Sequence, residues 1–444
     1  MLAGGIFTIV AEVADDVVVE EATDEYDPWT VAVRPLIKIE EGKRITRAML
    51  QEVVVLKESV PAGVVTDIAK VIGKYATKVL YPGDTIIEQH IRESGKDKDD
   101  EEAEQPDSQK GYLYITDYVK SGQEISDALQ KVIDENPNRT IYFPDGVYYL
   151  KKPVLTSSDP TKSVSFRLTH KAVLQAANSW EGESGEALIK IGGANPEAKD
   201  SLEVGNSVFF TGGIVAGEGK TTGISVESGR DVLIYNVSFK KTKIGVHIKT
   251  NHVDVDNCVI AGANAGDTIG VLVEGSYNTV QNMRICDIHT GIKLTAPNNI
   301  LRNLHPLYTP SMQSNESCGF WDESEGNFFD YCYSDQFAIA FRLADGNASV
   351  LNGCFAFWYS DATTRHWGIH AVGKFNALVR ATRIDMCDQG TNPINPDNAY
   401  LVVNEPGGFG KVLDPVSSGY SAYDNKFVLN VVDLNDILRD YWVK

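Results

Sequence analysis

The sequence predicts a chain built almost wholly of β-strands, most of which stack on one another as the coils of a solenoid. Three features favour this fold class. Short apolar strands recur at a nearly fixed spacing along residues 223–371, an asparagine returns at one position of the repeat, and one short stretch with helical spacing precedes the strands. The content of 38 Gly and 19 Tyr beside 5 Met is also typical of a turn-rich β protein.

The repeated strand begins with a small residue, in most coils a glycine, and continues with alternating apolar positions. This first residue occurs at seven places that are 21 to 28 residues apart: Gly223, Gly245, Gly270, Gly291, Gly319, Ala340 and Gly368. Because side chains alternate along a strand, each coil has one face directed inward and one directed outward. Stacking of the coils would bury the inward face.

A second predicted strand ends in an asparagine, twelve or thirteen residues after each of the first four glycines. These residues are Asn236, Asn257, Asn282 and Asn303. Asparagine tolerates the left-handed backbone of a turn, and its amide can bond the next coil, so we expect an asparagine ladder.

The position after this asparagine is expected to point into the core. It is occupied by medium-sized side chains in six coils: Val237, Cys258, Met283, Leu304, Cys332 and Cys354. The three cysteines of this column are therefore predicted to be core packing rather than catalytic or metal-binding groups. The chain has no CxxC pair, and we expect no metal and no cofactor.

The start of the solenoid is predicted from two adjacent segments. Residues 125–134 have the apolar spacing of a short amphipathic helix, which would cover the open end of the first coil, and residues 140–150 follow as strand. The pattern D-A-L-Q followed by I-Y-F-P-D-G-V-Y resembles the opening of the pectate-lyase-like superfamily. That superfamily includes polysaccharide lyases, relatives of polygalacturonases and many bacteriophage tailspikes. The resemblance covers residues 111–444 and implies an all-β, right-handed, single-stranded parallel β-helix capped by a short N-terminal helix. It does not specify a reaction, because one scaffold carries many functions.

Residues 30–92 are predicted to form a small β domain with tight turns at Gly42, Gly63, Gly73 and Gly83. The segments I-E-E-G-K-R-I-T-R-A-M-L, V-P-A-G-V-V-T-D and Y-P-G-D-T-I resemble the SAF (β-clip) domain of pilus and flagellum assembly proteins and sialic acid synthases. The resemblance implies that this domain serves in attachment rather than in catalysis.

Two further segments complete the predicted organisation. Residues 1–29 form an N-terminal extension whose apolar start is interpreted as a strand, or alternatively as the stub of an anchor or signal. Residues 93–110 contain an acidic run and are predicted to be a solvated linker. The formal charge of −20 argues against a nucleic-acid partner.

The distance from the asparagine position to the next glycine is longer in every second coil. The insertions are therefore expected to stack at one corner, and functional residues concentrate on such loops. Aromatic faces suit sugar rings, and polar groups beside them suit sugar hydroxyls. The predicted sugar-binding residues of this corner are His305, Tyr308, Tyr333, Trp358, Tyr359, Arg365, His366 and Trp367. The alternative, that such aromatics plug the corners of the solenoid, stays open.

Catalysis would require further groups at the same edge. For hydrolysis, two carboxylates must flank the glycosidic bond, and Asp287, Asp335 and Asp361 are the candidates, expected on successive coils. For elimination, a cation and a base are needed. The candidate cations are Arg365, Arg380 and Arg383, and the candidate bases are His366 and Tyr359. The paired-Asp signature of polygalacturonases is absent, which argues against that hydrolase family.

Three functions are compatible with these features. The first is a carbohydrate-recognising protein of tailspike or receptor-binding type. It would be a homotrimer whose N-terminal domain docks to a larger assembly, and it would bind, and in some cases cleave, a surface polysaccharide or glycan. The expected location is a virion tail or surface appendage, or the extracellular cell surface. The second is an extracellular glycoside hydrolase or polysaccharide lyase anchored to a cell. The third is a structural spacer, and the aromatic residues at one corner argue against this function.

Overall fold

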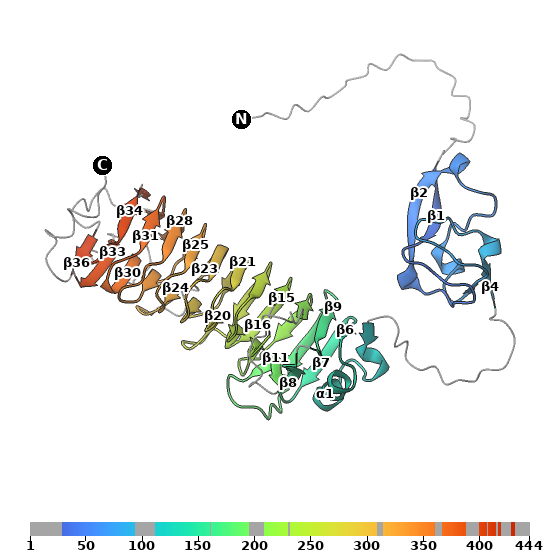
Figure 1. Cartoon of the computed structure of the whole chain (residues 1–444), viewed down its shortest axis with the longest axis horizontal. Coiled ribbons are helices and arrows are strands. Elements are labelled where there is room, and N and C mark those ends of the chain that lie inside the picture. Colours follow the sequence, from blue (N-terminus) through green and yellow to red (C-terminus); the bar gives the residue numbers. More distant parts are fainter. Residues whose placement is uncertain are drawn as a thin grey trace, which may run out of the picture. The chain divides into compact units, whose positions relative to one another are not determined.

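The chain folds into two compact units, Met1–Ala103 and Glu104–Lys444 (Figure 1). The computed structural model describes residues 29–93, 112–159, 161–194, 208–229, 231–308, 314–359, 366–387, 399–405, 407–413, 416–418 and 428–430. Residues 1–28 of the predicted extension and 94–110 of the predicted linker lie outside the described residues. Among the described residues, none of the helices has the length and apolar character that crossing a membrane requires.

The N-terminal unit is a small β structure with its own core. Strands β1 (Trp29–Pro35) and β2 (Leu50–Leu56) pair antiparallel, as do β3 (Tyr75–Ala76) and β4 (Ile91–Arg92). Four 3-10 turns connect the strands: η1 (Arg47–Met49), η2 (Lys57–Ser59), η3 (Ile68–Lys70) and η4 (Glu88–His90). The four predicted turn glycines have φ between 77° and 90°, which confirms their role. The SAF-like assignment of this unit stays a prediction.

The second unit is a parallel β-solenoid, which confirms the predicted fold class (Figure 1). Each coil contributes strands to three faces, which we name face 1, face 2 and face 3 in chain order. Faces 1 and 2 belong to one 21-stranded sheet, and face 3 is an 11-stranded sheet.

Face 1 contains β5 (Tyr112–Tyr114), β6 (Arg139–Phe143), β9 (Val164–Leu168), β12 (Val208–Thr211), β15 (Val232–Tyr235), β18 (Val253–Asp256), the first parts of β21 (Thr279–Cys286) and β23 (Ile300–Leu307), β25 (Phe328–Asp330), β28 (Val350–Asn352), β31 (Leu378–Arg380) and β34 (Lys411–Leu413). Face 2 contains β7 (Gly146–Leu150), β10 (Ala172–Ala176), β13 (Ile214–Ala216), β16 (Ser238–Thr242), β19 (Val259–Gly262), the second parts of β21 and β23, β26 (Tyr333–Asp335), β29 (Phe355–Tyr359), β32 (Arg383–Cys387) and β35 (Val416–Ser418). Face 3 contains β8 (Val154–Ser157), β11 (Ala187–Ala194), β14 (Thr222–Val226), β17 (Ile244–Ile248), β20 (Ile269–Val273), β22 (Thr290–Leu294), β24 (Cys318–Asp322), β27 (Ile339–Leu343), β30 (Trp367–Lys374), β33 (Ala399–Glu405) and β36 (Val428–Asn430).

The predicted helix is α1 (Ser126–Glu135), which lies at the N-terminal end of the solenoid (Figure 1). Its residues Leu129, Val132 and Ile133 are buried and belong to the continuous core of the coils. The helix therefore covers apolar side chains that the first coil would otherwise expose.

The repeated glycines lie near the start of the face 3 strands, where consecutive coils approach closely. A Cβ atom at Gly223 would lie 2.6 Å from the carbonyl oxygen of Gly245, and one at Gly245 would lie 2.7 Å from that of Gly270. Real Cβ atoms do not approach a carbonyl oxygen so closely, so the contact between coils itself selects glycine.

The four predicted ladder asparagines lie at the turn from face 1 to face 2, with φ between 49° and 57°. Asn303 Nδ2 donates to Asn282 Oδ1 at 2.9 Å, and Asn257 Nδ2 donates to Asn236 Oδ1 at 3.4 Å. The asparagine ladder is thus confirmed at these two steps, whereas Asn282 Nδ2 donates to Asp256 Oδ1 at 2.8 Å.

A second ladder lies at the buried turn from face 3 to face 1, and we did not predict it. The backbone N–H of Asn278 donates to Asn299 Oδ1 at 2.9 Å, and that of Asn299 donates to Asn327 Oδ1 at 2.8 Å. All three side chains are buried. They satisfy backbone groups that would otherwise lack partners in the interior.

The predicted cysteine column is inside the core. Cys258, Cys332 and Cys354 are all buried, and burial raises the pKa of the Cys258 thiol to about 12. The three cysteines are core packing, as predicted, because all three belong to the continuous core of the coils.

We expect the substitution Gly245→Ala to lower the free energy of unfolding by about 1–3 kcal/mol, the usual cost of overpacking. The control is Gly266→Ala, because a Cβ at Gly266 would meet nothing within 4 Å. Urea unfolding followed by tryptophan fluorescence measures both variants. Equal stabilities of the two variants would contradict the steric explanation of the glycine column.

Candidate functional site

The connections from face 2 to face 3 all lie at one corner of the solenoid. The longer connections 308–317 and 360–366 alternate with the short ones 287–289 and 336–338, as predicted. The alternation ends at the next connection, 388–398, which is also long. Asp361, Arg365 and the side chain of Tyr359 lie outside the described residues.

Three of the predicted sugar-binding aromatics are buried, so their expected place on the surface is corrected. Tyr308, Trp358 and His366 are 4%, 1% and 3% exposed. Trp358 Nε1 donates to the carbonyl of Phe337, and the His366 ring stacks on the Trp358 ring at 5.1 Å. These rings fill the corner of the solenoid. This agrees with the alternative interpretation, in which the aromatic residues plug the corners and do not bind sugar.

Other predicted residues meet on the outer surface of face 2. His305, Tyr333, Phe355 and Arg383 follow one another on β23, β26, β29 and β32, and we name this set the aromatic strip. The ring centroids of His305 and Tyr333 are 4.1 Å apart, and those of Tyr333 and Phe355 are 4.7 Å apart. The Arg383 guanidinium lies 5.7 Å from the Phe355 centroid. The strand spacing of about 4.8 Å brings outward rings into stacking contact.

A second outward column runs beside the aromatic strip. It contains Leu307, Asp335, Phe357 and Asp385, which are register partners on the same four strands. Asp385 and Arg383 form an ion pair of 2.5 Å, and the hydrogen bond and charge of Asp385 raise the pKa of Arg383. Carboxylates thus border the apolar strip on one side.

Asp335 is the polar centre of this surface. Its Oδ2 accepts a hydrogen bond from Tyr333 Oη at 3.0 Å and lies 3.4 Å from His305 Nε2. Its Oδ1 is buried and has no hydrogen-bond partner among the described residues. Since buried carboxylate oxygens normally accept hydrogen bonds, Asp335 keeps capacity for a ligand donor.

The structure therefore brings together His305, Tyr333 and Asp335 of the predicted set, and it adds Arg383 from the predicted cations. We expected Asp287 to lie on the coil next to that of Asp335, and this prediction is wrong. The adjacent residue Cys286 pairs with Leu307, which pairs with Asp335, so the two aspartates are two coils apart. The predicted Arg380 lies on face 1 and Trp367 on face 3.

Sequence reasoning missed Phe355, Phe357 and Asp385. The signal was present, because Phe355 directly follows Cys354 of the inward column, as Tyr333 follows Cys332. Aligning the coils on that column would have placed these residues on the outer surface. Within the described residues, no group of three His, Cys, Asp or Glu side chains is arranged to hold a metal ion.

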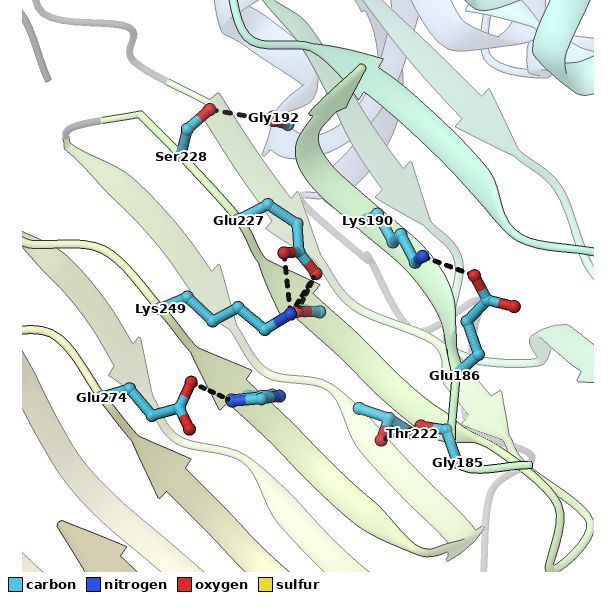
Figure 2. Close-up of polar contacts among 11 residues, drawn as sticks. Gly185, Glu186, Lys190, Gly192, Thr222, Glu227, Ser228, Lys249 and Glu274 are labelled. Carbon is cyan, nitrogen blue, oxygen red and sulfur yellow. Dashed lines mark hydrogen bonds and ion pairs between the residues drawn. The ribbon is translucent and has the colours of Figure 1, made fainter. Parts of the chain in front are cut away.

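The outer surface of face 3 offers a comparison, because several of its charged side chains are paired with one another (Figure 2). Lys249 bonds Glu227 at 2.8 Å, and His247 bonds Glu274 at 2.9 Å, in each case between neighbouring coils. Burial raises the pKa of Glu227, but the hydrogen bonds from Lys249 and Ser225 outweigh it and lower the pKa overall. These ion pairs connect neighbouring coils, so the groups that form them have structural partners.

The burial of His366 has a consequence for pH dependence. Burial lowers the pKa of His366 to about 3, whereas an unfolded histidine titrates near 6.5. The unfolded chain therefore takes up a proton first as the pH falls, so the stability contributed by neutral His366 is complete above pH 6.5 and declines below it. When the pH falls from 7 to 5, the free energy of unfolding of the wild type should decrease by about 2 kcal/mol more than that of His366→Gln.

Urea unfolding at the two pH values measures this difference, and the exposed His170→Gln serves as the control. The same pH dependence in the wild type and in both variants would show that His366 is not held neutral in the folded state.

No family model matches this sequence, and no curated protein matches it. Several solved structures are similar to this chain at low identity. The surface adhesin PfbA of Streptococcus pneumoniae is 14% identical, over 69% of this chain and 91% of that chain, with a TM-score of 0.41. A tailspike protein of E. coli bacteriophage HK620 is 12% identical, over 69% of this chain and 67% of that chain, with a TM-score of 0.49. The catalytic domain of a GH87 α-1,3-glucanase is 11% identical, over 92% of this chain and 86% of that chain, with a TM-score of 0.43.

Proposed function

We propose that the β-solenoid binds a surface polysaccharide through the aromatic strip of face 2, in a receptor-binding protein of tailspike type. The observation that carries this proposal is the half-buried stack of His305, Tyr333 and Phe355 beside the partly unsatisfied carboxylate of Asp335. Sugars offer apolar C–H surfaces and many hydroxyl groups, and their sites combine aromatic surface with convergent polar groups.

The polar groups of the strip suit hydroxyl ligands. The contact of Asp335 with His305 is long, at 3.4 Å, so a sugar hydroxyl can compete for this carboxylate. The exposed guanidinium of Arg383 adds donors at the other end of the strip. The band of apolar ring edges between these groups extends over three coils, which is long enough to contact more than one sugar unit.

The proposal includes attachment through the N-terminal domain, assembly as a homotrimer, and a location on a virion or cell surface. The separate core of the N-terminal unit supports a distinct attachment module. On face 1, a column of outward apolar side chains supports packing against a second copy, because exposed apolar patches of this kind mark interaction surfaces. The column consists of Ile300, Phe328, Val350 and Leu378. Light scattering of the full chain tests this part, and a monomer would contradict it.

One observation favours the second candidate, a glycoside hydrolase. Asp335 and Asp385 occupy the same outward column with Phe357 between them, so their backbones lie about 9–10 Å apart. Inverting glycosidases separate their two carboxylates by roughly 6.5–9.5 Å, and the spacing here is comparable.

We expect Tyr333→Ala and Phe355→Ala each to weaken polysaccharide binding at least tenfold, because each removes a ring from the strip. A tenfold loss corresponds to about 1.4 kcal/mol, well within what an aromatic contact contributes. The measurement is retention on a polysaccharide panel, with reducing-end and unsaturated products read in parallel. Release of a cleavage product from any polysaccharide of the panel would favour a glycoside hydrolase or a polysaccharide lyase.

The matched control is Phe209→Ala, which removes a half-buried outward phenylalanine from face 1. We expect this variant to bind like the wild type. Equal binding by all three variants, with a polysaccharide that the wild type retains, would exclude the strip as the sugar site.

A further inference from the structure

The N-terminal unit contains a pocket that the proposed sugar site does not involve. It has a volume of about 280 Å³ and lies between the loop that precedes η3 and the strand β4. Its walls combine apolar and charged side chains, among them Val64, Ile91, Lys70, Lys74, Arg92 and Glu88. Backbone hydrogen bonds from Val65 to Ile86 and from Glu88 to Gly63 fix the two walls.

The charges of this pocket are predominantly positive. Lys74 pairs with the exposed Glu93 at 2.8 Å, and this pairing neutralises both charges. The other charges that line the pocket are the positive charges of Lys70 and Arg92 and the negative charge of Glu88. The surroundings have the same sign, because residues 29–93 contain ten Lys and Arg against eight Asp and Glu, in a chain whose formal charge is −20.

Arg92 supplies the most specific feature. Its Nε is buried, and among the described residues it has no hydrogen-bond partner. Guanidinium N–H groups are strong donors, and leaving one buried without an acceptor is costly. The pocket beside Arg92 is therefore the place from which an acceptor can come.

We infer that this pocket binds a carboxylate carried on a short aliphatic stem. The planar fork of a guanidinium matches a carboxylate, and Lys70 adds a second positive charge. Val64 and Ile91 offer apolar contacts to the methylene groups of the stem. The volume accommodates a single such group rather than a folded surface, and typical sites for drug-sized ligands are larger, about 300–1,000 Å³.

Two sources could present this chemistry, a free dicarboxylic acid or a glutamate side chain of a partner's peptide. The test uses the full-length chain and isothermal titration calorimetry with glutarate and with a capped tri-glutamate peptide. Glutaramide and a capped tri-glutamine peptide are the uncharged counterparts. We expect binding of the charged probes, with weaker binding at higher salt.

Arg92→Gln and the exposed Lys70→Gln are each expected to weaken carboxylate binding at least tenfold. Lys57→Gln is the matched control, because Lys57 lies on η2 and does not line the pocket. Tyr333→Ala should bind the carboxylates like the wild type, so failure of the sugar site and failure of this pocket can be told apart. Lys70→Gln keeps the test informative if Arg92→Gln does not fold.

Each result decides the inference. Tighter binding of tri-glutamate than of glutarate supports the pocket as a docking point for a partner's acidic peptide, and equal binding supports a free acid. The inference is overturned if no charged probe binds at 10 mM, if the uncharged probes bind equally well, or if Lys70→Gln and Lys57→Gln bind alike.

Discussion

The hydrogen bonding of each coil to the next, in register, is the constraint on which the rest of this structure depends. Parallel strands repeat at about 4.8 Å, so a residue at one position of a coil lies directly over its counterpart in the next. The glycine column, the asparagine ladders, the cysteine column and the aromatic strip all follow from this one geometry. In each case a side chain that suits its own coil must also suit the coils above and below it.

The same constraint explains how polar groups are tolerated in the interior. Asp322 is fully buried at the end of a face 3 strand. Its Oδ1 accepts hydrogen bonds from the backbone and hydroxyl of Ser324 and from Asn327, and its Oδ2 accepts one from Ser349 at 2.5 Å. A buried carboxylate is costly unless it is hydrogen-bonded, and here the next coil provides one of the donors. Asp335, on the outer surface, has no such set of donors, and this contrast distinguishes a structural aspartate from a candidate functional one.

The fold was predictable because its signals recur. Gly223, Gly245 and Gly270 mark the coils, and Asn236 and Asn257 mark the turns, without any knowledge of which strands pair. The buried Asn278 and Asn299 lie four residues before Asn282 and Asn303, whereas valines occupy the same position before Asn236 and Asn257, so the second ladder has the weaker signal in the sequence.

The site was less predictable, because loop lengths show where the connections lie but not which way a ring points. Trp358 lies next to the end of β29, and its ring is buried against Phe337 and His366. Alternation from the inward Cys354 and Ala356 accounts for this direction, and the same alternation directs Phe355, the first residue of the strand, outward. Alternation along the strands was therefore a more reliable guide to the exposed surface than the loops.

The series of connections at the corner between face 2 and face 3, in which long and short ones alternate, also bears on how such a chain can diversify. A loop at this corner lies outside the register pairs of the strands, and doubling its length costs only about 0.6 kcal/mol of closure entropy. Insertions and deletions there leave every register pair of the three faces unchanged. The loops at this corner can thus change in length and sequence while the inherited scaffold stays the same.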